Sequence, residues 1–545
     1  MSLLPLFVSA LSLASLQQAH VEANPHLAVE THQGPVRGVL ENDIVAFKGI
    51  PYAAPPVGDL RWRPPQPPDP WSDTLLADTY GHACPQPIRR STPEWGREYL
   101  DEVGISEDCL TLNVWRPAEQ GDESLPVTVY IHGSGWKYAA SSWPVWTGEN
   151  LAREDLVVVN FNYRLGLMGR FAHPALSRLE GDDLLANYNI LDQIAVLEWV
   201  QENIAEFGGD PNRVTLFGHS AGGVSVNFLM ATPRSEGLFH GAIAQGSGVQ
   251  IDRTRHLSEP GVPGPAEQSL EAIGLDIAEE FGVSGGSDEE IVRRLRAIPA
   301  DELNAYLKPE IVLNPVVDGD LLPDDLPVLF EKGLQHDVPY ITGVSDWEWN
   351  QIDNVPLIAK WFLAKPMLAG LDDEDLELFS DQRTRIGLSQ QWFNNGVFFV
   401  PSRYLAKQMK TVPAAARMYH VTYRQTAIRS DDAFAGAPHG LEVPFLFGHL
   451  RERPEFSRPE PVELTAEDFR FGEIVRAYWV NFAKTGDPNG PGLPEWPEFN
   501  PDNGRDITLD LGTEVIARDN FKRDLAEHIE RRALERRARF LRGGR

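Results

Sequence analysis

The chain has 545 residues, of which 42% are hydrophobic, enough to bury a substantial core, and it shows no repeat of 20 to 50 residues. Its 49 Lys and Arg against 79 Asp and Glu give a net charge of −30, which argues against nucleic acid or an anionic membrane as a partner. The sequence contains no metal-ligand cluster, P-loop or dinucleotide fingerprint, so we expect neither a metal nor a cofactor.

The N-terminus predicts export. Residues 3–16 are apolar and too short to span a bilayer, and Val21-Glu22-Ala23 provides a small-residue cleavage site before Asn24. The leader has no Lys or Arg ahead of its apolar segment, which is atypical of a signal peptide. We predict a signal peptide over residues 1–23, one mature domain over residues 24–545, and a secreted or periplasmic protein.

Ser220 lies in a segment that predicts an exposed nucleophile. It is the centre of Gly218-His219-Ser220-Ala221-Gly222, between an apolar, β-branched run at 214–217 and an apolar stretch at 224–230. This order predicts a strand, a sharp turn and a helix, the setting of a nucleophile elbow. The glycines allow the strand and helix to approach closely, which leaves the hydroxyl exposed. A plain strand-to-helix turn is the alternative interpretation of this motif alone.

A second glycine-rich segment follows the strand-like run 127–131. In His132-Gly133-Ser134-Gly135-Trp136, small residues free the backbone N–H groups to point toward one spot. We expect the N–H groups of Ser134 and Gly135, together with that of Ala221, to form an oxyanion hole. An ordinary glycine-rich loop is the alternative.

A serine nucleophile needs a base, and the base needs an acid to fix its tautomer. Among the 14 histidines, His439 stands at a polar-to-apolar junction that follows the loop 431–438. The acid should lie between the serine and the histidine in the chain. The strand-like run 339–345 leads to both Asp346 and Glu348, and spacing alone does not choose between them.

Together these motifs resemble the type-B carboxylesterase family, the α/β-hydrolases that include cholinesterases, liver carboxylesterases and fungal lipases. The resemblance covers nearly the whole mature chain. The matching blocks are Phe47-Lys48-Gly49-Ile50-Pro51-Tyr52-Ala53, Glu107-Asp108-Cys109-Leu110-Thr111-Leu112-Asn113-Val114-Trp115, Asn162-Tyr163-Arg164-Leu165-Gly166, Phe207-Gly208-Gly209-Asp210-Pro211 with Ser220-Ala221-Gly222, and Asn481-Phe482-Ala483-Lys484-Thr485-Gly486-Asp487-Pro488. It implies a single α/β-hydrolase domain with a large, mixed but mostly parallel central sheet, flanking helices, and inserted loops and helices around an active-site gorge.

The resemblance also implies roles for individual residues. Ser220 corresponds to the nucleophile and His439 to the general base. Glu348 is selected as the acid because the family's acid lies five residues after the glycine that corresponds to Gly343, and Asp346 becomes the fallback. The implied reaction is ester hydrolysis through an acyl-enzyme.

The two cysteines, Cys84 and Cys109, match the family's first disulfide, which closes a loop over the gorge. Two reduced thiols in a cytosolic protein are the alternative. The segment from about 255 to 300 is expected to be an insertion of loops and helices beside the active site.

Departures from the family pattern bear on the substrate. His219 stands where the family usually has Glu, and we interpret it as a packed imidazole bonded to a neighbour such as Glu442, with a direct role as the alternative. Gly133-Ser134-Gly135 replaces three glycines, and Trp136 replaces a common Phe. Trp349 replaces the glycine that usually follows the acid.

Basic and aromatic side chains near the expected gorge suggest substrate contacts. By resemblance Lys137 points into or near the gorge, and Arg89 and Arg90 lie in the loop between the cysteines. Such cations would favour an anionic ester, although solvated side chains are the alternative. Trp136, Lys137 and His219 are our candidate substrate-binding residues. Tyr138, Trp143 and Trp146 crowd the same stretch, where they line an aromatic cleft or fill the core around the loop.

We therefore expect a secreted serine carboxylester hydrolase acting on medium to bulky carboxylic esters. One alternative is an esterase specialised for polycarboxylate esters, such as the tricarballylate esters of fumonisins that some family members hydrolyse. Another is a non-catalytic, cholinesterase-like binding or adhesion protein. Residues 521–545 carry nine Lys or Arg against four acids and predict a partly amphipathic helix around Leu525, Ile529, Ala533 and Phe540. We expect that helix to be solvated, with a tether to the acidic body or to a membrane as the alternative.

Overall fold

The structure, a computed structural model, describes the greater part of the chain. The described residues are 27–87, 94–180, 186–252, 254–260, 268–306, 314–349, 371, 373–379, 384–429, 436–450 and 463–542. The predicted signal peptide and the two arginines Arg89 and Arg90 lie outside these ranges.

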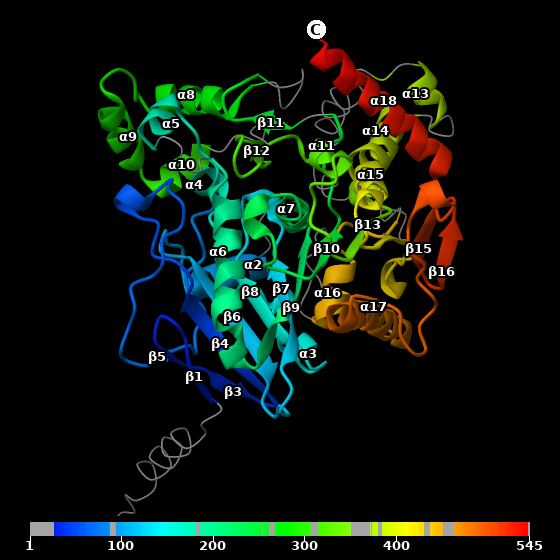
Figure 1. The fold of residues 1–545 in the computed structure, drawn as a ribbon, viewed down its shortest axis with the longest axis horizontal. Helices are drawn as coiled ribbons and strands as arrows, with labels where there is room; N and C mark the ends of the chain where they lie inside the picture. The colour runs from blue at the N-terminus through cyan, green and yellow to red at the C-terminus, as the bar shows by residue number, and fades with distance from the viewer. Residues whose placement is uncertain are drawn as a thin grey trace, which may run out of the picture.

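A large sheet passes through the centre of the molecule and contains eleven strands of the described residues (Figure 1). In spatial order they are β16 (Val515–Asp519), β15 (Ile507–Leu511), β14 (Ala416–Val421), β13 (Tyr340–Ser345), β10 (Gly241–Gln245), β9 (Gly209–His219), β7 (Leu125–Ile131), β8 (Val157–Phe161), β6 (Thr111–Pro117), β4 (Ile44–Pro51) and β3 (Val39–Glu41). Neighbours from β15 through β8 pair in parallel, whereas β16, β6, β4 and β3 pair antiparallel. The expected mixed, mostly parallel sheet is confirmed.

The sheet is buried on both faces, which is why its central strands read as continuous apolar runs. In β7 the side chains of Val127, Val129 and Ile131 belong to one hydrophobic core and that of Tyr130 to the other. Helices α6 (Tyr188–Asn203) and α7 (Ala221–Leu229) contribute to the first core. Helices α16 (Glu442–Phe447) and α17 (Ala466–Thr485) contribute to the second.

The remaining elements surround this three-layer body. Two small sheets are formed by β1 (Ala28–Glu30), β2 (Pro35–Arg37) and β5 (Leu75–Leu76), and by β11 (Arg255–His256) and β12 (Val316–Val317). The other α-helices of the described residues, apart from the C-terminal one, are α2 (Glu94–Val103), α3 (Glu149–Ala152), α4 (Gly166–Gly169), α5 (Pro174–Glu180), α8 (Leu270–Glu280), α9 (Asp288–Arg296), α10 (Ala300–Tyr306), α11 (Leu326–Glu331), α13 (Asp373–Glu377), α14 (Arg385–Trp392) and α15 (Val400–Gln408), with a π-helical segment Phe393–Phe399 between the last two. The expected insertion at 255–300 thus contains helices α8 and α9.

The basic C-terminal helix α18 (Arg523–Leu541) is packed against the body and crosses one end of it near α13 and α15 (Figure 1). Its own side chains Ala526, Ile529 and Ala533 are buried against the body. Arg536 Nε lies 2.7 Å from Asp252 Oδ2, and Arg537 Nη2 lies 2.6 Å from Glu331 Oε1. The expectation of a solvated helix was therefore wrong, because its arginines neutralise carboxylates of the acidic body.

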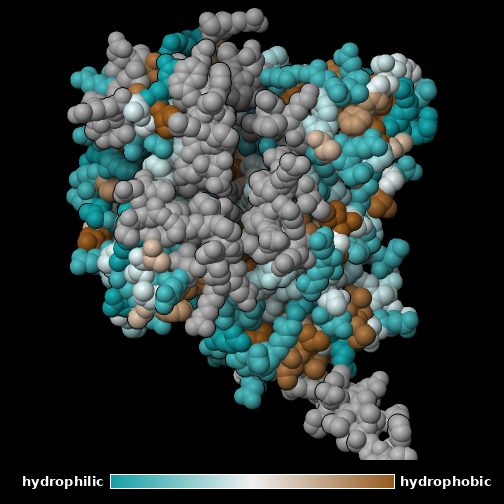
Figure 2. Space-filling model, turned by 180° about the vertical axis from the view of Figure 1, so that it is seen from behind, coloured by the Kyte–Doolittle hydropathy of each residue, from teal (hydrophilic) through white to brown (hydrophobic). Residues whose placement is uncertain are grey.

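Some hydrophobic residues are exposed together on the surface (Figure 2). On the face shown in Figure 2, hydrophobic residues gather near the lower end of the molecule, the end that β1, β3 and β5 form in Figure 1. Leu40 of β3 and Leu76 of β5 are among the exposed large hydrophobic side chains. Within the described residues, no helix combines the length and the hydropathy needed to cross a membrane.

Candidate active site

Ser220 occupies the sharp turn between β9 and α7. Its backbone has φ 58° and ψ −123°, a conformation that non-glycine residues adopt only when their surroundings enforce it. The Ser220 N–H donates to Gln245 O of β10 at 2.8 Å. A Cβ on Gly218 would lie 2.6 Å from the backbone of Gly222, and one on Gly222 would lie 2.0 Å from Ile131 O. The flanking glycines are therefore required by the close approach of strand and helix, as the sequence predicts.

The carboxylate that contacts His439 belongs to the segment that follows β13. The carboxylate of Glu348 is fully buried, its Oε1 accepts the N–H of Ser345 at 2.7 Å, and its Oε2 contacts His439 Nδ1. A neutral imidazole that donates from Nδ1 keeps Nε2 as its acceptor. Asp346 instead accepts the backbone N–H of Ala437. Of the two carboxylates that spacing leaves open, the structure thus pairs Glu348 with His439.

The rings of His219 and His439 lie together beside the elbow. Their centroids are 4.4 Å apart, and the centroid of the Phe398 ring lies 5.5 Å from that of His439. Two glycines in the left-handed region make room for this pair. A Cβ on Gly246 would lie 3.1 Å from both rings, and one on Gly440 would lie 2.5 Å from His219 Cε1. Because His219 precedes Ser220 in the chain, this packing brings the His439 ring next to the elbow.

The segment after β7 lies directly against Ser220. A Cβ on Gly133 would be 2.9 Å from Ser220 Cβ and 2.5 Å from His219 O. Ser134, Gly135 and Trp136 follow with φ values of 66°, 64° and 56°, all in the left-handed region. Such a run turns successive N–H groups toward one side of the chain. The segment that carries Ser134 and Gly135, two of the three expected oxyanion donors, therefore begins beside the elbow, where Ala221, the third, begins α7.

Trp136 is anchored inside the protein. Its side chain is buried, and its Nε1 donates to Ser225 Oγ of α7 at 3.0 Å. The guanidinium of Arg170 lies over the indole, 4.8 Å from the ring. Gln193 Nε2 of α6 also donates to Ser225 Oγ, at 3.2 Å. The sequence did not point to Ser225, Arg170 or Gln193, since these contacts join segments that are remote in the chain.

The other side chains of this stretch divide between core and surface. Trp143 and Trp146 are buried and stack with ring centroids 5.3 Å apart, so they fill the core beneath the loop. Tyr138 is exposed. Lys137 is half-buried at the end of the left-handed run, where its N–H donates to Ser134 O at 3.1 Å.

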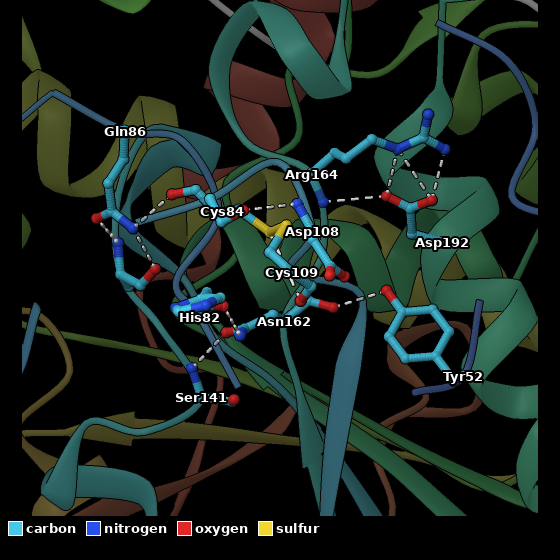
Figure 3. The surroundings of a disulfide bond; sticks show 12 residues. Tyr52, His82, Cys84, Gln86, Asp108, Cys109, Ser141, Asn162, Arg164 and Asp192 are labelled. Atoms are coloured by element: carbon cyan, nitrogen blue, oxygen red, sulfur yellow. Dashed lines mark hydrogen bonds and ion pairs between the residues drawn. A yellow bond between two sulfur atoms is a disulfide. The ribbon is translucent and has the colours of Figure 1, made fainter. Parts of the chain in front are cut away.

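The cysteines lie next to this loop. Figure 3 shows the bond between Cys84 and Cys109 with Gln86 beside it. Gln86 Nε2 donates to Ala139 O at 2.9 Å, and Gln86 Oε1 accepts the Ala139 N–H at 2.9 Å. Ala139 lies three residues after Trp136, so Gln86 connects the cysteine segment to the chain that leaves the expected oxyanion hole.

Glu442, the expected partner of His219, is a second buried carboxylate near His439. Its Oε1 accepts the Tyr419 hydroxyl at 3.0 Å and the Gln245 amide at 3.5 Å. Burial raises the pKa of Glu442. The ring of His219 contacts the ring of His439, with centroids 4.4 Å apart.

The comparison with known proteins identifies the family. The model of the Carboxylesterase family matches residues 25–359 and 373–527. The chain belongs to the carboxylesterase family. Fumonisin B1 esterase of Sphingopyxis macrogoltabida is 33% identical over 504 residues, which cover 87% of this chain and 85% of that protein. Para-nitrobenzyl esterase of Bacillus subtilis (strain 168) is 31% identical over 503 residues, 89% of this chain and 95% of that protein.

Solved structures agree with this assignment. A carboxylesterase of Geobacillus stearothermophilus has 30% sequence identity and superimposes with a TM-score of 0.78 over 93% of this chain and 99% of its own. The expected α/β-hydrolase fold is confirmed. The family and its named esterases support carboxylic ester hydrolysis as the activity of this carboxylesterase, with small-molecule esters as the substrates.

Proposed function

We propose that this carboxylesterase is a serine hydrolase in which Ser220 is the nucleophile, His439 the general base and Glu348 the acid that orients His439. The observation that carries the proposal is the contact of Glu348 Oε2 with His439 Nδ1 next to the strained backbone of Ser220. This contact fixes the imidazole tautomer and stabilises the imidazolium that forms when the serine loses its proton.

The chemistry follows from this arrangement. Ser220 Oγ attacks the ester carbonyl while His439 Nε2 takes its proton. The N–H groups of Ser134, Gly135 and Ala221 stabilise the oxyanion, and His439 then gives the proton to the leaving alcohol. Water, activated by His439, hydrolyses the acyl-enzyme and restores the serine.

The test is hydrolysis of a neutral chromogenic ester by the purified protein and by Ser220→Ala and Glu348→Gln. Ser220→Ala should lose about six orders of magnitude in kcat, and Glu348→Gln about four, because the acid acts only through His439. A fluorophosphonate should label the wild type once per chain and leave Ser220→Ala unlabelled. Turnover that persists in Ser220→Ala would remove the serine mechanism. Absence of Ser220-dependent turnover with any ester would favour the binding or adhesion protein.

For the substrate we propose medium to bulky carboxylic esters, with polycarboxylate esters as a second candidate. Two observations favour the second candidate. The half-buried Lys137 directly follows the expected oxyanion loop, and a relative is named fumonisin B1 esterase. The net charge of −30 acts in the opposite direction, because it repels anionic substrates at long range.

Paired esters separate these candidates. Lys137→Ala should raise KM for an ester that carries free carboxylates and leave KM for a neutral ester of equal size nearly unchanged. Lys137→Arg is the matched control, because it keeps the charge. Equal effects of Lys137→Ala on the KM of both esters would contradict a role of Lys137 in binding anionic esters. Rising salt concentration should raise KM for the anionic ester only.

We also propose that residues 1–23 are a signal peptide and that the enzyme is secreted or periplasmic. The bond between Cys84 and Cys109 supports an oxidising compartment. Expression of the full chain with sequencing of the exported protein tests this. A mature N-terminus at Asn24 is expected, and retention of the intact chain in the cytosol with two titratable thiols would contradict it.

A further inference from the structure

Asp346 joins the two segments that carry Glu348 and His439. After β13, the chain from Asp346 to Trp347 runs beside the segment 436–438. The Trp347 N–H donates to Ala437 O at 3.0 Å, and Trp347 forms a parallel bridge with Pro438. In return, the Ala437 N–H donates to Asp346 Oδ1 at 2.5 Å. The Ala437 carbonyl is therefore bonded to the backbone of Trp347, and the Ala437 N–H is bonded to the side chain of Asp346.

Two details show that this contact is built into the fold. The Asp346 N–H donates to Val421 O of β14 at 3.0 Å, so its backbone is fixed to the central sheet. A Cβ on Gly436 would lie 2.3 Å from Asp346 Oδ1. A glycine at position 436 is therefore needed for the carboxylate to reach the Ala437 N–H.

Asp346 is charged at neutral pH, although its surroundings raise its pKa. Burial raises its pKa to about 6, whereas the ammonium of Lys522 lowers it and the carboxylates of Asp510 and Glu348 raise it. Lys522 Nζ is itself held by Asn395 Oδ1 at 3.1 Å, just ahead of α18. The carboxylate thus faces a lysine and the Ala437 N–H, while the imidazole of His439 is bonded to Glu348.

We propose that Asp346 is a positioning residue that holds the segment 436–439 in register with the segment 345–348, and so sets His439 against Glu348. The geometry gives the reason: Glu348 lies two residues after Asp346, and His439 lies two residues after Ala437. Any shift between the two segments therefore changes the distance from Glu348 to His439 directly. The inference rests on the proposed serine mechanism and gives Asp346 a role other than that of the triad acid.

The experiment compares Asp346→Ala, Asp346→Asn, Gly436→Ala and Glu348→Gln on a neutral ester, with kcat expressed per site counted by a fluorophosphonate titrant. Asp346→Ala and Gly436→Ala should each lower kcat about 10- to 100-fold, because small misplacements of catalytic groups have effects of that size. KM should stay within about threefold, since no substrate contact is removed. Asp346→Asn should keep kcat within about threefold of the wild-type value, because the asparagine amide oxygen can still accept the Ala437 N–H.

Asp510→Ala is the matched control for loss of a nearby carboxylate, since Asp510 pairs with Arg518 and Thr422 and does not contact the segment 436–439. It should leave kcat unchanged. Counting sites by titration separates a misfolded fraction from a slower site. A loss in Asp346→Asn as large as in Glu348→Gln would overturn the proposal and make Asp346 the acid. Unchanged kcat in both Asp346→Ala and Gly436→Ala would also overturn it. Activity that survives in Ser220→Ala would instead remove the underlying mechanism.

Discussion

The imidazole rings of His219 and His439 pack with their centroids 4.4 Å apart and their planes at 47°. His439 becomes a cation in each half of the proposed reaction, so the group beside it affects how easily that cation forms. A second imidazole provides an aromatic neighbour without a fixed negative charge. The family's usual residue at this position, Glu, would place a carboxylate there.

His219→Glu should therefore shift the acid limb of the kcat/KM profile upward, because a nearby carboxylate favours the imidazolium, the inactive form of the base. The pH profile of a neutral ester measures the shift. His219→Gln is the uncharged control and should keep the midpoint of the wild type. An equal shift in both variants would show that packing, and not charge, is responsible.

Trp136→Phe should lower kcat by about tenfold and leave KM for neutral and anionic esters nearly unchanged. The upper limit of the loss in kcat is about 10²- to 10³-fold, the effect of losing one oxyanion donor completely. The change removes the indole N–H that donates to Ser225 and holds the left-handed run, while an aromatic ring remains for the guanidinium of Arg170. Steady-state kinetics on both esters separates anchoring from substrate contact. A raised KM with constant kcat would restore Trp136 as a substrate-binding residue.

Replacing both cysteines by serine should lower the free energy of unfolding by about 3.5 kcal/mol, the chain-entropy value for the separation of 25 residues between Cys84 and Cys109. Urea denaturation measures it. A reductant should lower the midpoint of the wild type and leave that of the double variant unchanged. Because Gln86 bonds Ala139, the double variant should also lose some kcat. A wild type that resists reductant while both thiols titrate as free would contradict this prediction.

The local features of the site were predictable from the sequence because they depend on near neighbours. The turn around Ser220 was expected from an apolar run, two glycines and a helix, and the structure has β9, Ser220 and α7 in that order. The strand that leads to Asp346 and Glu348 was expected too, and it is β13. The choice between the two carboxylates was not available from spacing, because it depends on the segment 436–439, about 90 residues later in the chain.

Remote contacts account for what the sequence did not predict. The hydrogen bond from Trp136 to Ser225 spans 89 residues. The C-terminal helix was predicted as amphipathic, but its basic face binds Asp252 and Glu331, which lie 284 and 206 residues away from Arg536 and Arg537. A charge pattern indicates that a helix has a polar face, but it does not show which carboxylates the fold brings to that face.

Asp346 also predicts how stability changes with pH. Its pKa is raised from 3.8 to about 6, chiefly by burial, so the folded protein binds this proton more tightly than the unfolded chain does. The stability that this group contributes is present below pH 3.8 and is lost as the pH rises through about 6. Asparagine carries no such proton at any pH. The stability of Asp346→Asn relative to the wild type should therefore increase between pH 4 and pH 7 by up to about 3 kcal/mol.

Thermal unfolding of both proteins at pH 4 and pH 7 in the same buffer series measures this difference, and other titrating groups cancel in the comparison at each pH. For a chain of this length, about 3 kcal/mol corresponds to a change in relative Tm of about 3 °C. A relative Tm of Asp346→Asn that stays constant or falls from pH 4 to pH 7 would show that Lys522 compensates fully for the burial of Asp346.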